Sequence, residues 1–152
     1  MPLDPSFAGR SWPPTEPYLV GREKIREFAR AIGAVDAEYH EPAAARALGY
    51  PDVVAPPTFP TVVTMAASRQ IISDPALGMD YSRVVHGEQK FRYTRPVVAG
   101  DALVCVNTVE EITQRWGHDF ITTRTDVSTE SGELVVTAWS KLVQRGEAGG
   151  AA

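Results

Sequence analysis

Three segments of the sequence decide the fold, and they stand in a fixed order: AARALGYPDVVAPPTF at residues 44–59, HGEQ at 86–89 and FRYTRPVVAGD at 91–101. The first begins with a helical turn of small residues that Gly49 closes, because glycine readily takes the positive φ of a helix C-terminus. The other two have the alternation and the aromatic content of β-strands. The Ala-Gly-Asp sequence that ends the third segment predicts a tight turn into a further strand.

An apolar run follows the proline pair of the first segment and predicts a long central helix from about Thr58 to Ile72. Its apolar residues fit a period of about 3.6 and cover most of the circumference, as expected when a sheet wraps around a helix. Thr58 is its expected N-cap residue. Further helices are expected at 22–32 and 42–48, and strands at 18–20, 83–95, 103–115, 119–128 and 133–143. Helices followed by an antiparallel meander predict the α+β class.

Length and composition predict one domain over residues 1–145 and a disordered tail at 146–152, since the 152-residue chain is 43% hydrophobic and 22% charged. The formal charge of −4 and the absence of a Lys/Arg cluster argue against a nucleic-acid partner. The lone Cys105 is expected to be a small buried hydrophobe. No signal-peptide pattern or apolar stretch of spanning length is present, so we expect a cytoplasmic protein that does not engage a membrane. The histidines lack metal-ligand spacing, and neither a metal nor a cofactor is expected.

These segments resemble the hotdog-fold dehydratases and hydratases of the MaoC type. More narrowly, they are similar to the N-terminal MaoC-dehydratase group, which includes the small subunits of actinobacterial (3R)-hydroxyacyl-acyl-carrier-protein dehydratase. The resemblance runs from about Tyr18 to Val143 and includes GREKIREFARAIG at 21–33. It implies a single hotdog domain, in which a curved antiparallel sheet surrounds the central helix. It also implies a second hotdog subunit, in a homodimer or a heterodimer with active sites at the interface.

The chemistry implied by the resemblance is the addition or removal of water across the α,β-bond of an acyl thioester in fatty-acyl metabolism. The thioester is carried by coenzyme A or by acyl-carrier protein. By the same resemblance, the start of the central helix and the HGEQ strand line the substrate channel, and backbone N–H groups at a helix N-terminus can stabilise charge on the thioester oxygen. The candidate substrate-binding residues are Pro57, Thr58, Phe59, Thr61, His86, Gly87 and Gln89.

The acid/base pair of the family's active members is where this sequence departs from the pattern. Those enzymes carry G-D-x-N-P-hydrophobic-H before the small helix, and in register the Asp position falls on Ala34 and the His position on Tyr39. A shift of one residue would place His40 on the His position but Val35 on the Asp position. Tyr39 and His40 are the candidate catalytic residues. A Tyr hydroxyl, with a pKa of about 10, is a poor base at neutral pH.

Two arginines of the third segment leave two interpretations open. Arg92 or Arg95 could bind the phosphate of a coenzyme A or phosphopantetheine arm, because a guanidinium matches phosphate geometry. Alternatively, they lie on a solvated strand face and pair with Glu88 or Asp101.

Three functions fit these residues. In the first, favoured because the acid/base pair is missing, the chain is the substrate-binding half of a heterodimer whose partner supplies Asp and His. In the second, the chain is a homodimeric enoyl-CoA hydratase that uses Tyr39, His40 or His86. In the third, it binds an acyl thioester without chemistry.

Overall fold

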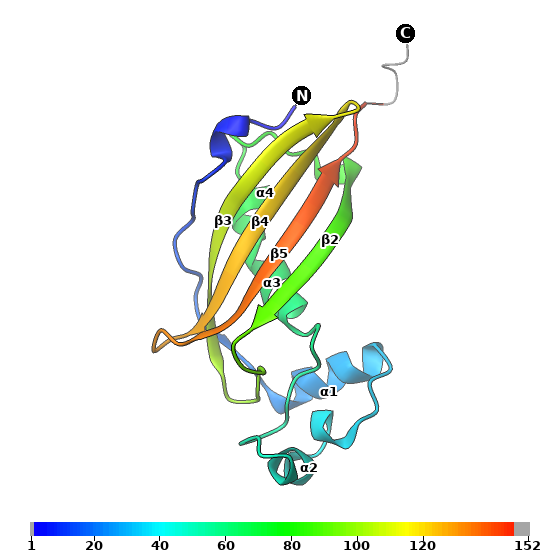
Figure 1. Ribbon diagram of the computed structural model, residues 1–152, viewed down its shortest axis with the longest axis vertical. Coiled ribbons are helices and arrows are strands. Elements are labelled where there is room, and N and C mark those ends of the chain that lie inside the picture. Colours follow the sequence, from blue (N-terminus) through cyan, green and yellow to red (C-terminus); the bar gives the residue numbers. More distant parts are fainter. Residues whose placement is uncertain (1, 148–152) are drawn as a thin grey trace.

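The computed structural model describes residues 2–147, which form one antiparallel sheet of five strands in the order β1-β3-β4-β5-β2. The strands are β1 (Tyr18–Leu19), β2 (Val84–Tyr93), β3 (Ala102–Arg115), β4 (His118–Thr129) and β5 (Leu134–Gln144). Buried and half-buried residues alternate along β4, because one face of the sheet is turned to the core. The sheet curves around the central helix (Figure 1), as the sequence predicts.

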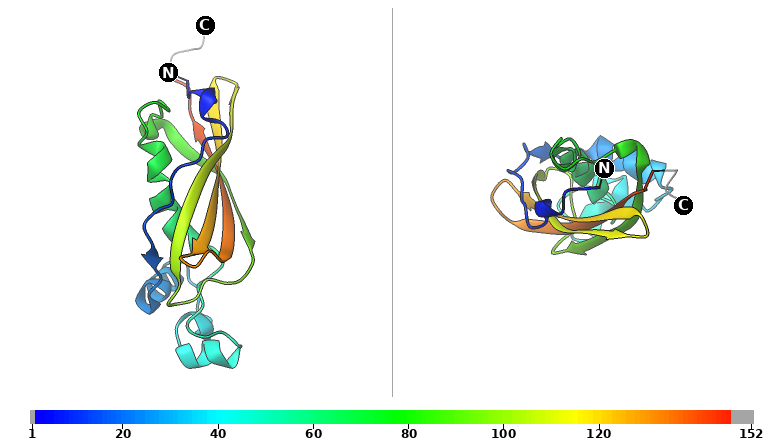
Figure 2. Two further views of the ribbon diagram at one scale, coloured as in Figure 1. Left: turned by 90° about the vertical axis from the view of Figure 1, so that its left-hand side faces the viewer. Right: turned by 90° about the horizontal axis from the view of Figure 1, so that it is seen from above.

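The helices lie inside the curve of the sheet or beyond its end (Figure 2). They are α1 (Arg22–Ala31), α2 (Pro42–Ala47), α3 (Pro60–Ala67) and α4 (Arg69–Ile72), with short 3-10 helices η1 (Pro5–Phe7), η2 (Ala37–Tyr39) and η3 (Tyr81–Arg83). Phe59, at the start of α3, is fully buried and meets the ring of Phe28 edge to face, with 5.5 Å between centroids. This contact joins α1 to the core that α3 forms with the sheet.

The prediction of one continuous helix over 58–72 is wrong, because the helix is interrupted at Ser68. The Ser68 hydroxyl donates to the Met65 carbonyl at 2.8 Å, and such side-chain bonds compete with the helical ladder. The Asn107 amide on β3 donates to the Ala67 carbonyl at 2.9 Å. Two carbonyls at the interruption are thus satisfied by side chains.

Thr58 as the N-cap residue is also wrong. The helix begins at Pro60, and the residue before it, Phe59, has helical dihedral angles and makes no side-chain cap. Proline is favoured at the first helical position, because its fixed φ suits the helix and the missing N–H needs no partner there. The hydroxyl that acts in this turn belongs to Thr61, which donates to the Thr58 carbonyl at 2.8 Å.

An N-terminal strap, residues 2–17, runs along the outer edge of β3 (Figure 1). Backbone N–H groups of Gly9 and Trp12 donate to carbonyls of β3 at 2.7 and 3.0 Å. The strap's own side chains Leu3 and Phe7 are buried in a core cluster and anchor the strap to the fold. Because β1 and the strap cover β3, the open edge of the sheet in the described residues is that of β2.

Several smaller expectations can be compared with the described residues. Cys105 is fully buried, as predicted, and burial raises the pKa of its thiol to about 11. Of the predicted tail at 146–152, the backbone N–H of Gly146 donates to His118 Nδ1 at 2.9 Å, and residues 148–152 lie outside the described part. Within residues 2–147, no helix has the length and apolar character needed to cross a membrane.

Candidate functional site

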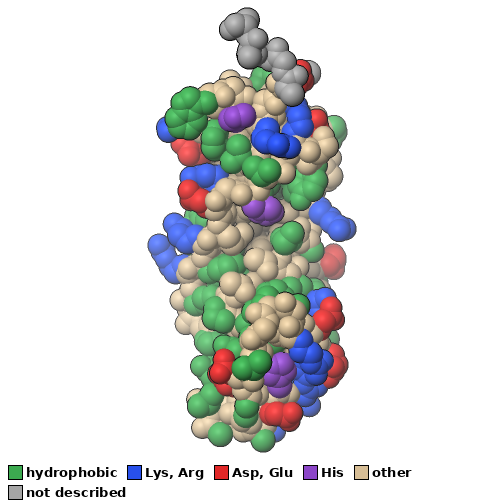
Figure 3. Space-filling view, turned by 90° about the vertical axis from the view of Figure 1, so that its right-hand side faces the viewer, with side chains coloured by type: hydrophobic (Ala, Val, Ile, Leu, Met, Phe, Trp, Pro, Cys, Tyr) green, Lys and Arg blue, Asp and Glu red, His purple; other side chains and the backbone are tan. Residues whose placement is uncertain are grey.

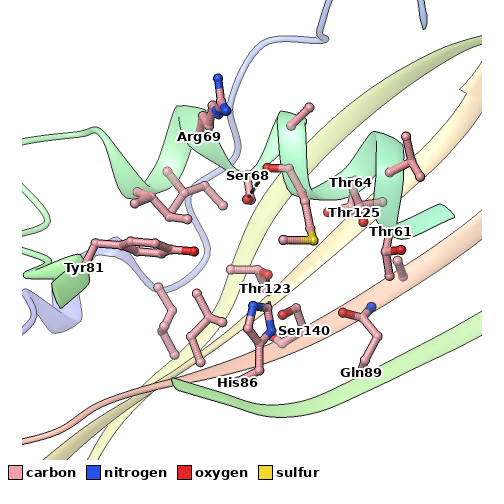
Figure 4. Close-up of a pocket in the computed structure, with 18 of the residues that line it drawn as sticks. Thr61, Thr64, Ser68, Arg69, Tyr81, His86, Gln89, Thr123, Thr125 and Ser140 are labelled. Carbon is pink, nitrogen blue, oxygen red and sulfur yellow. Dashed lines mark hydrogen bonds between the residues drawn. The ribbon is translucent and has the colours of Figure 1, made fainter. Parts of the chain in front are cut away.

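A cavity of about 740 Å³ lies between α3–α4 and the inner face of β2, β4 and β5. We call it the central cavity. Its walls are mainly apolar, with Met65 and Ile72 from the helices opposite Ile121 and Leu142 from the sheet. Polar side chains occupy its middle (Figure 4). The surface beside the open edge of β2 carries mostly uncharged side chains along its centre (Figure 3).

Two predicted site residues, His86 and Gln89, point into the central cavity from β2 (Figure 4). In a regular strand they would face opposite sides, since they are three positions apart. The pairing of β2 with β5 shifts between His86 and Glu88, which leaves Gly87 as a bulge and brings both side chains to the inner face. A Cβ atom at position 87 would lie 3.3 Å from the Lys141 carbonyl oxygen, so the bulge favours glycine.

The start of α3 contributes Thr61 to the wall of the same cavity. The backbone N–H groups here already have partners: that of Phe59 donates to the Pro56 carbonyl at 2.9 Å, and that of Thr61 to the Thr58 carbonyl at 3.2 Å. Pro60 has no N–H to offer. Two of the three amides expected to stabilise a thioester oxyanion, those of Phe59 and Thr61, therefore already have acceptors, whereas the N–H of Thr58 has none in the described part of the chain.

A second cavity of about 230 Å³, the loop cavity, lies beside the segment where the family carries its acid/base pair. Tyr39 and Pro57 line it together with Tyr50 and Tyr93. Burial, reinforced by the nearby Glu38 carboxylate, raises the pKa of Tyr39 above its ordinary value. Tyr39 is therefore protonated at neutral pH and unsuited to act as a base.

The other candidate catalytic residue, His40, lines neither cavity. Its Nε2 lies 2.9 Å from the Ala34 carbonyl oxygen, and because a carbonyl only accepts, this ring nitrogen is the donor. The backbone carbonyl of His40 accepts from Arg26 Nε at 2.8 Å. His40 thus closes the loop around Ala34, the position at which the family's Asp is expected.

The sequence-predicted residues are therefore divided among several places. Thr61, His86 and Gln89 meet in the central cavity, and Tyr39 and Pro57 in the loop cavity. Phe59 is a core residue with no exposed surface. Thr58, His40 and Gly87 line neither cavity.

Sequence reasoning missed several hydroxyl residues that line the central cavity, namely Thr64, Ser68, Tyr81, Thr123, Thr125 and Ser140. A signal was present in ITTRT at 121–125, where every second residue of a half-buried strand must face the core. Threonine at two of those inner positions departs from the apolar pattern of a core strand.

Of the two interpretations of Arg95, the ion pair is confirmed. Its guanidinium donates to both carboxylate oxygens of Asp101 at 2.9 Å and also contacts Glu133. The bond to Asp101 raises the pKa of Arg95 further. Arg92 instead lies over the ring of Trp139, with 5.3 Å to the centroid, on the side of β2 away from the cavity. Among residues 2–147, no group of three or more His, Cys, Asp or Glu side chains could hold a metal ion.

Comparison with known proteins gives matches over nearly the whole chain. The model of the FAS1-like dehydratase domain region matches residues 6–138. A UPF0336 protein of Streptomyces avermitilis is 59% identical over 145 residues, which are 95% of this chain and 97% of the relative. A UPF0336 protein of Saccharopolyspora erythraea is 55% identical over 148 residues, 97% of this chain and 95% of the relative.

Two solved structures are similar in both fold and sequence. A MaoC-like dehydratase superposes with a TM-score of 0.85 at 35% identity, over 93% of this chain but only 43% of that longer one. The HadBC (3R-hydroxyacyl-ACP dehydratase) complex of Mycobacterium tuberculosis has a TM-score of 0.82 at 32% identity, over 90% of this chain and 96% of the matched one. The ChsH1-ChsH2 complex of the same organism, at 22% identity and a TM-score of 0.68, shares the fold.

Proposed function

Since the chain belongs to the FAS1-like dehydratase-region family of MaoC-like hotdog dehydratases, we propose that it is the substrate-binding subunit of a heterodimeric (3R)-hydroxyacyl thioester dehydratase. A partner hotdog subunit supplies the Asp and His that remove water. This chain supplies the central cavity as part of the channel for the acyl group. The same pair of subunits would catalyse hydration of an enoyl thioester in the reverse direction.

The observation that carries the proposal is the state of the loop at 34–40. Ala34 occupies the Asp position and has no group that can move a proton. Tyr39, on the His position, has a raised pKa, and His40 donates its Nε2 proton to a backbone carbonyl. A general base must lie within hydrogen-bond reach of its proton, and this loop offers none to the central cavity.

Two further features support a role in binding. The central cavity, at about 740 Å³, falls in the range of ligand sites, and its walls are mostly apolar with a few polar groups, as such sites are. The open edge of β2 lies beside it, so a second subunit placed there would cover the cavity. The similarity to the HadBC complex, a (3R)-hydroxyacyl-ACP dehydratase, agrees with this arrangement.

One observation favours a second candidate, a homodimeric hydratase that works alone. The imidazole of His86 lines the central cavity and has no hydrogen-bond partner in the described part of the chain. An imidazole can both accept and donate a proton in general acid–base catalysis. It lacks the carboxylate that orients the histidine in the family's pair, which is why this candidate ranks second.

The test is hydration of crotonyl-coenzyme A and of a longer trans-2-enoyl thioester, followed at the enoyl absorbance. We expect the purified chain alone to be inactive, and a mixture with an intact-motif hotdog protein from the same genome to be active. Turnover by the chain alone would refute the proposal. In that case His86→Asn should abolish turnover and His118→Asn, on the far hairpin, should not.

A further inference from the structure

The inner face of the sheet carries a band of polar side chains across its middle. Thr123 on β4 is paired directly with Ser140 on β5, and Ser140 with Gln89 on β2. Two residues further along β4, and on the same face, Thr125 is paired with Asn107 on β3. We call these five residues the polar stripe.

Apolar rows flank the polar stripe on both sides. Ile121 and Leu142 are cross-strand partners on one side, and Val127 and Val136 on the other. All four are buried. On β4 and β5 the polar residues are therefore bounded by apolar ones, while on β2 the row of Ile121 and Leu142 ends in the polar His86 at the open edge.

The helix opposite the stripe adds a further hydroxyl. Thr64 on α3 is only 7% exposed and borders the central cavity, and its hydroxyl has no hydrogen-bond partner among the residues described. A helical threonine can donate to a carbonyl of the preceding turn, but Thr64 does not. Thr64 and Thr125 line the same cavity, one from the helix and the other from the sheet. Figure 4 shows both beside α3. The cavity thus has polar side chains on both walls.

The side chains of the stripe are only partly satisfied within the chain. Asn107 and Thr125 bond to each other at 2.8 Å. The Thr123 hydroxyl is 3.5 Å from the Ser140 carbonyl oxygen, which is the limit of a hydrogen bond, and the Ser140 hydroxyl has no partner within residues 2–147. These hydroxyls are free to donate to, or accept from, whatever fills the cavity.

An alkyl chain that crossed the polar stripe would displace the water from these hydroxyls, and it could not replace the hydrogen bonds that the water made. Each hydroxyl buried without a partner is unfavourable enough to weaken binding by about tenfold. A ligand that carries its own oxygen at this depth avoids that loss. A carbonyl accepts from Thr64 or Ser140, and a hydroxyl can both donate and accept.

We propose that the central cavity selects acyl thioesters whose chain carries a hydroxyl or carbonyl oxygen at the depth of the polar stripe, beyond the β-carbon at which water is added or removed. This inference rests on the proposed function, because it takes the acyl chain to enter the central cavity. The stripe then acts as a specificity determinant for oxygenated chains over plain alkyl chains.

The test is a binding measurement that needs no turnover. Dodecanoyl-coenzyme A and oxo-dodecanoyl analogues, with the carbonyl moved stepwise along the chain, are titrated by calorimetry into the full chain, alone and mixed with the intact-motif hotdog protein. We expect one or two carbonyl positions to bind at least about tenfold more tightly than the alkyl thioester. Equal affinity for all of them would overturn the inference while leaving the proposed function intact.

Substitutions test which side chains cause the preference for a carbonyl-bearing acyl chain. Thr123→Val with Ser140→Ala should remove the preference for the carbonyl and tighten binding of the alkyl thioester, and Thr64→Val should do the same from the helix side. Thr122→Val, on the outer face of the same strand, is the matched control and should change neither. Retention of the preference for the carbonyl in both the Thr123→Val/Ser140→Ala variant and the Thr64→Val variant would overturn the inference. If no thioester binds in any mixture, the proposed function itself fails, and this inference with it.

Discussion

Replacing Asn107 by alanine should destabilise the fold strongly, because its buried side chain joins the sheet to the central helix. The Asn107 side chain is fully buried and makes three hydrogen bonds, to the Ala67 carbonyl at 2.9 Å, to Gln70 Oε1 at 3.0 Å and from the Thr125 hydroxyl at 2.8 Å. Thr125 borders the cavity and Gln70 is only partly buried, so both can regain water after the change. The Ala67 carbonyl has no such access, and we expect a loss of about 2–3 kcal/mol in the free energy of unfolding.

Urea unfolding checks this value. Ser128→Ala is the matched control, because Ser128 lies on the outer face of β4 and its hydroxyl makes no hydrogen bond in the described structure. A second comparison uses Thr125→Val: the double variant should lose less than the two single variants together, since they share one bond. For a chain of this size the melting temperature should fall by about 5–10 °C. A loss below about 0.5 kcal/mol, or one equal to that of the control, would refute the reasoning.

Three further predictions follow from single side chains. Tyr39→Phe should leave the activity of the reconstituted complex within about tenfold, and a loss of about 10²-fold or more would show that Tyr39 transfers a proton. The bond from Arg22 lowers the pKa of Asp52 to about 2, below the unfolded value, so Asp52 stabilises the fold above about pH 4 and loses this effect as the pH falls to about 2. The difference in urea midpoint between the wild type and Asp52→Asn should therefore disappear as the pH is lowered from about 4 to about 2. A difference that stays constant over this pH range would contradict the prediction. Leu3→Ala should lower the free energy of unfolding, measured in urea, by about 2–4 kcal/mol, because Leu3 is only 2% exposed. Leu19→Ala is the control and should lower it little, because Leu19 is 71% exposed. Equal losses would show that Leu3 does not anchor the strap.

The order of the elements could be predicted from sequence because it depends on local signals. The alternation in β3 to β5, the proline pair and the turn glycines all act within a few residues of one another. The same signals carried the resemblance to the MaoC-like hotdog dehydratases, which the family match confirms.

The features that could not be predicted depend on contacts between distant residues. The interruption at Ser68 involves a bond from Asn107, which is 40 positions away from Ala67 in the chain. The shared orientation of His86 and Gln89 requires a bulge, which a period of two does not reveal. The polar stripe appears only once the registers of three strand pairs are known, because its members are isolated polar residues in separate strands.

The N-terminal strap also sets an upper limit on how copies of the fold can associate through their sheets. A strand with unpaired backbone groups is a template for the next chain, and a sheet with two such edges can grow without end. In the described residues the strap occupies one of the two edges, since Gly9, Trp12 and Thr15 donate to the carbonyls of β3. Edge-to-edge pairing through β2 can therefore join two copies, but the covered edge of β3 does not offer a third copy the same backbone groups.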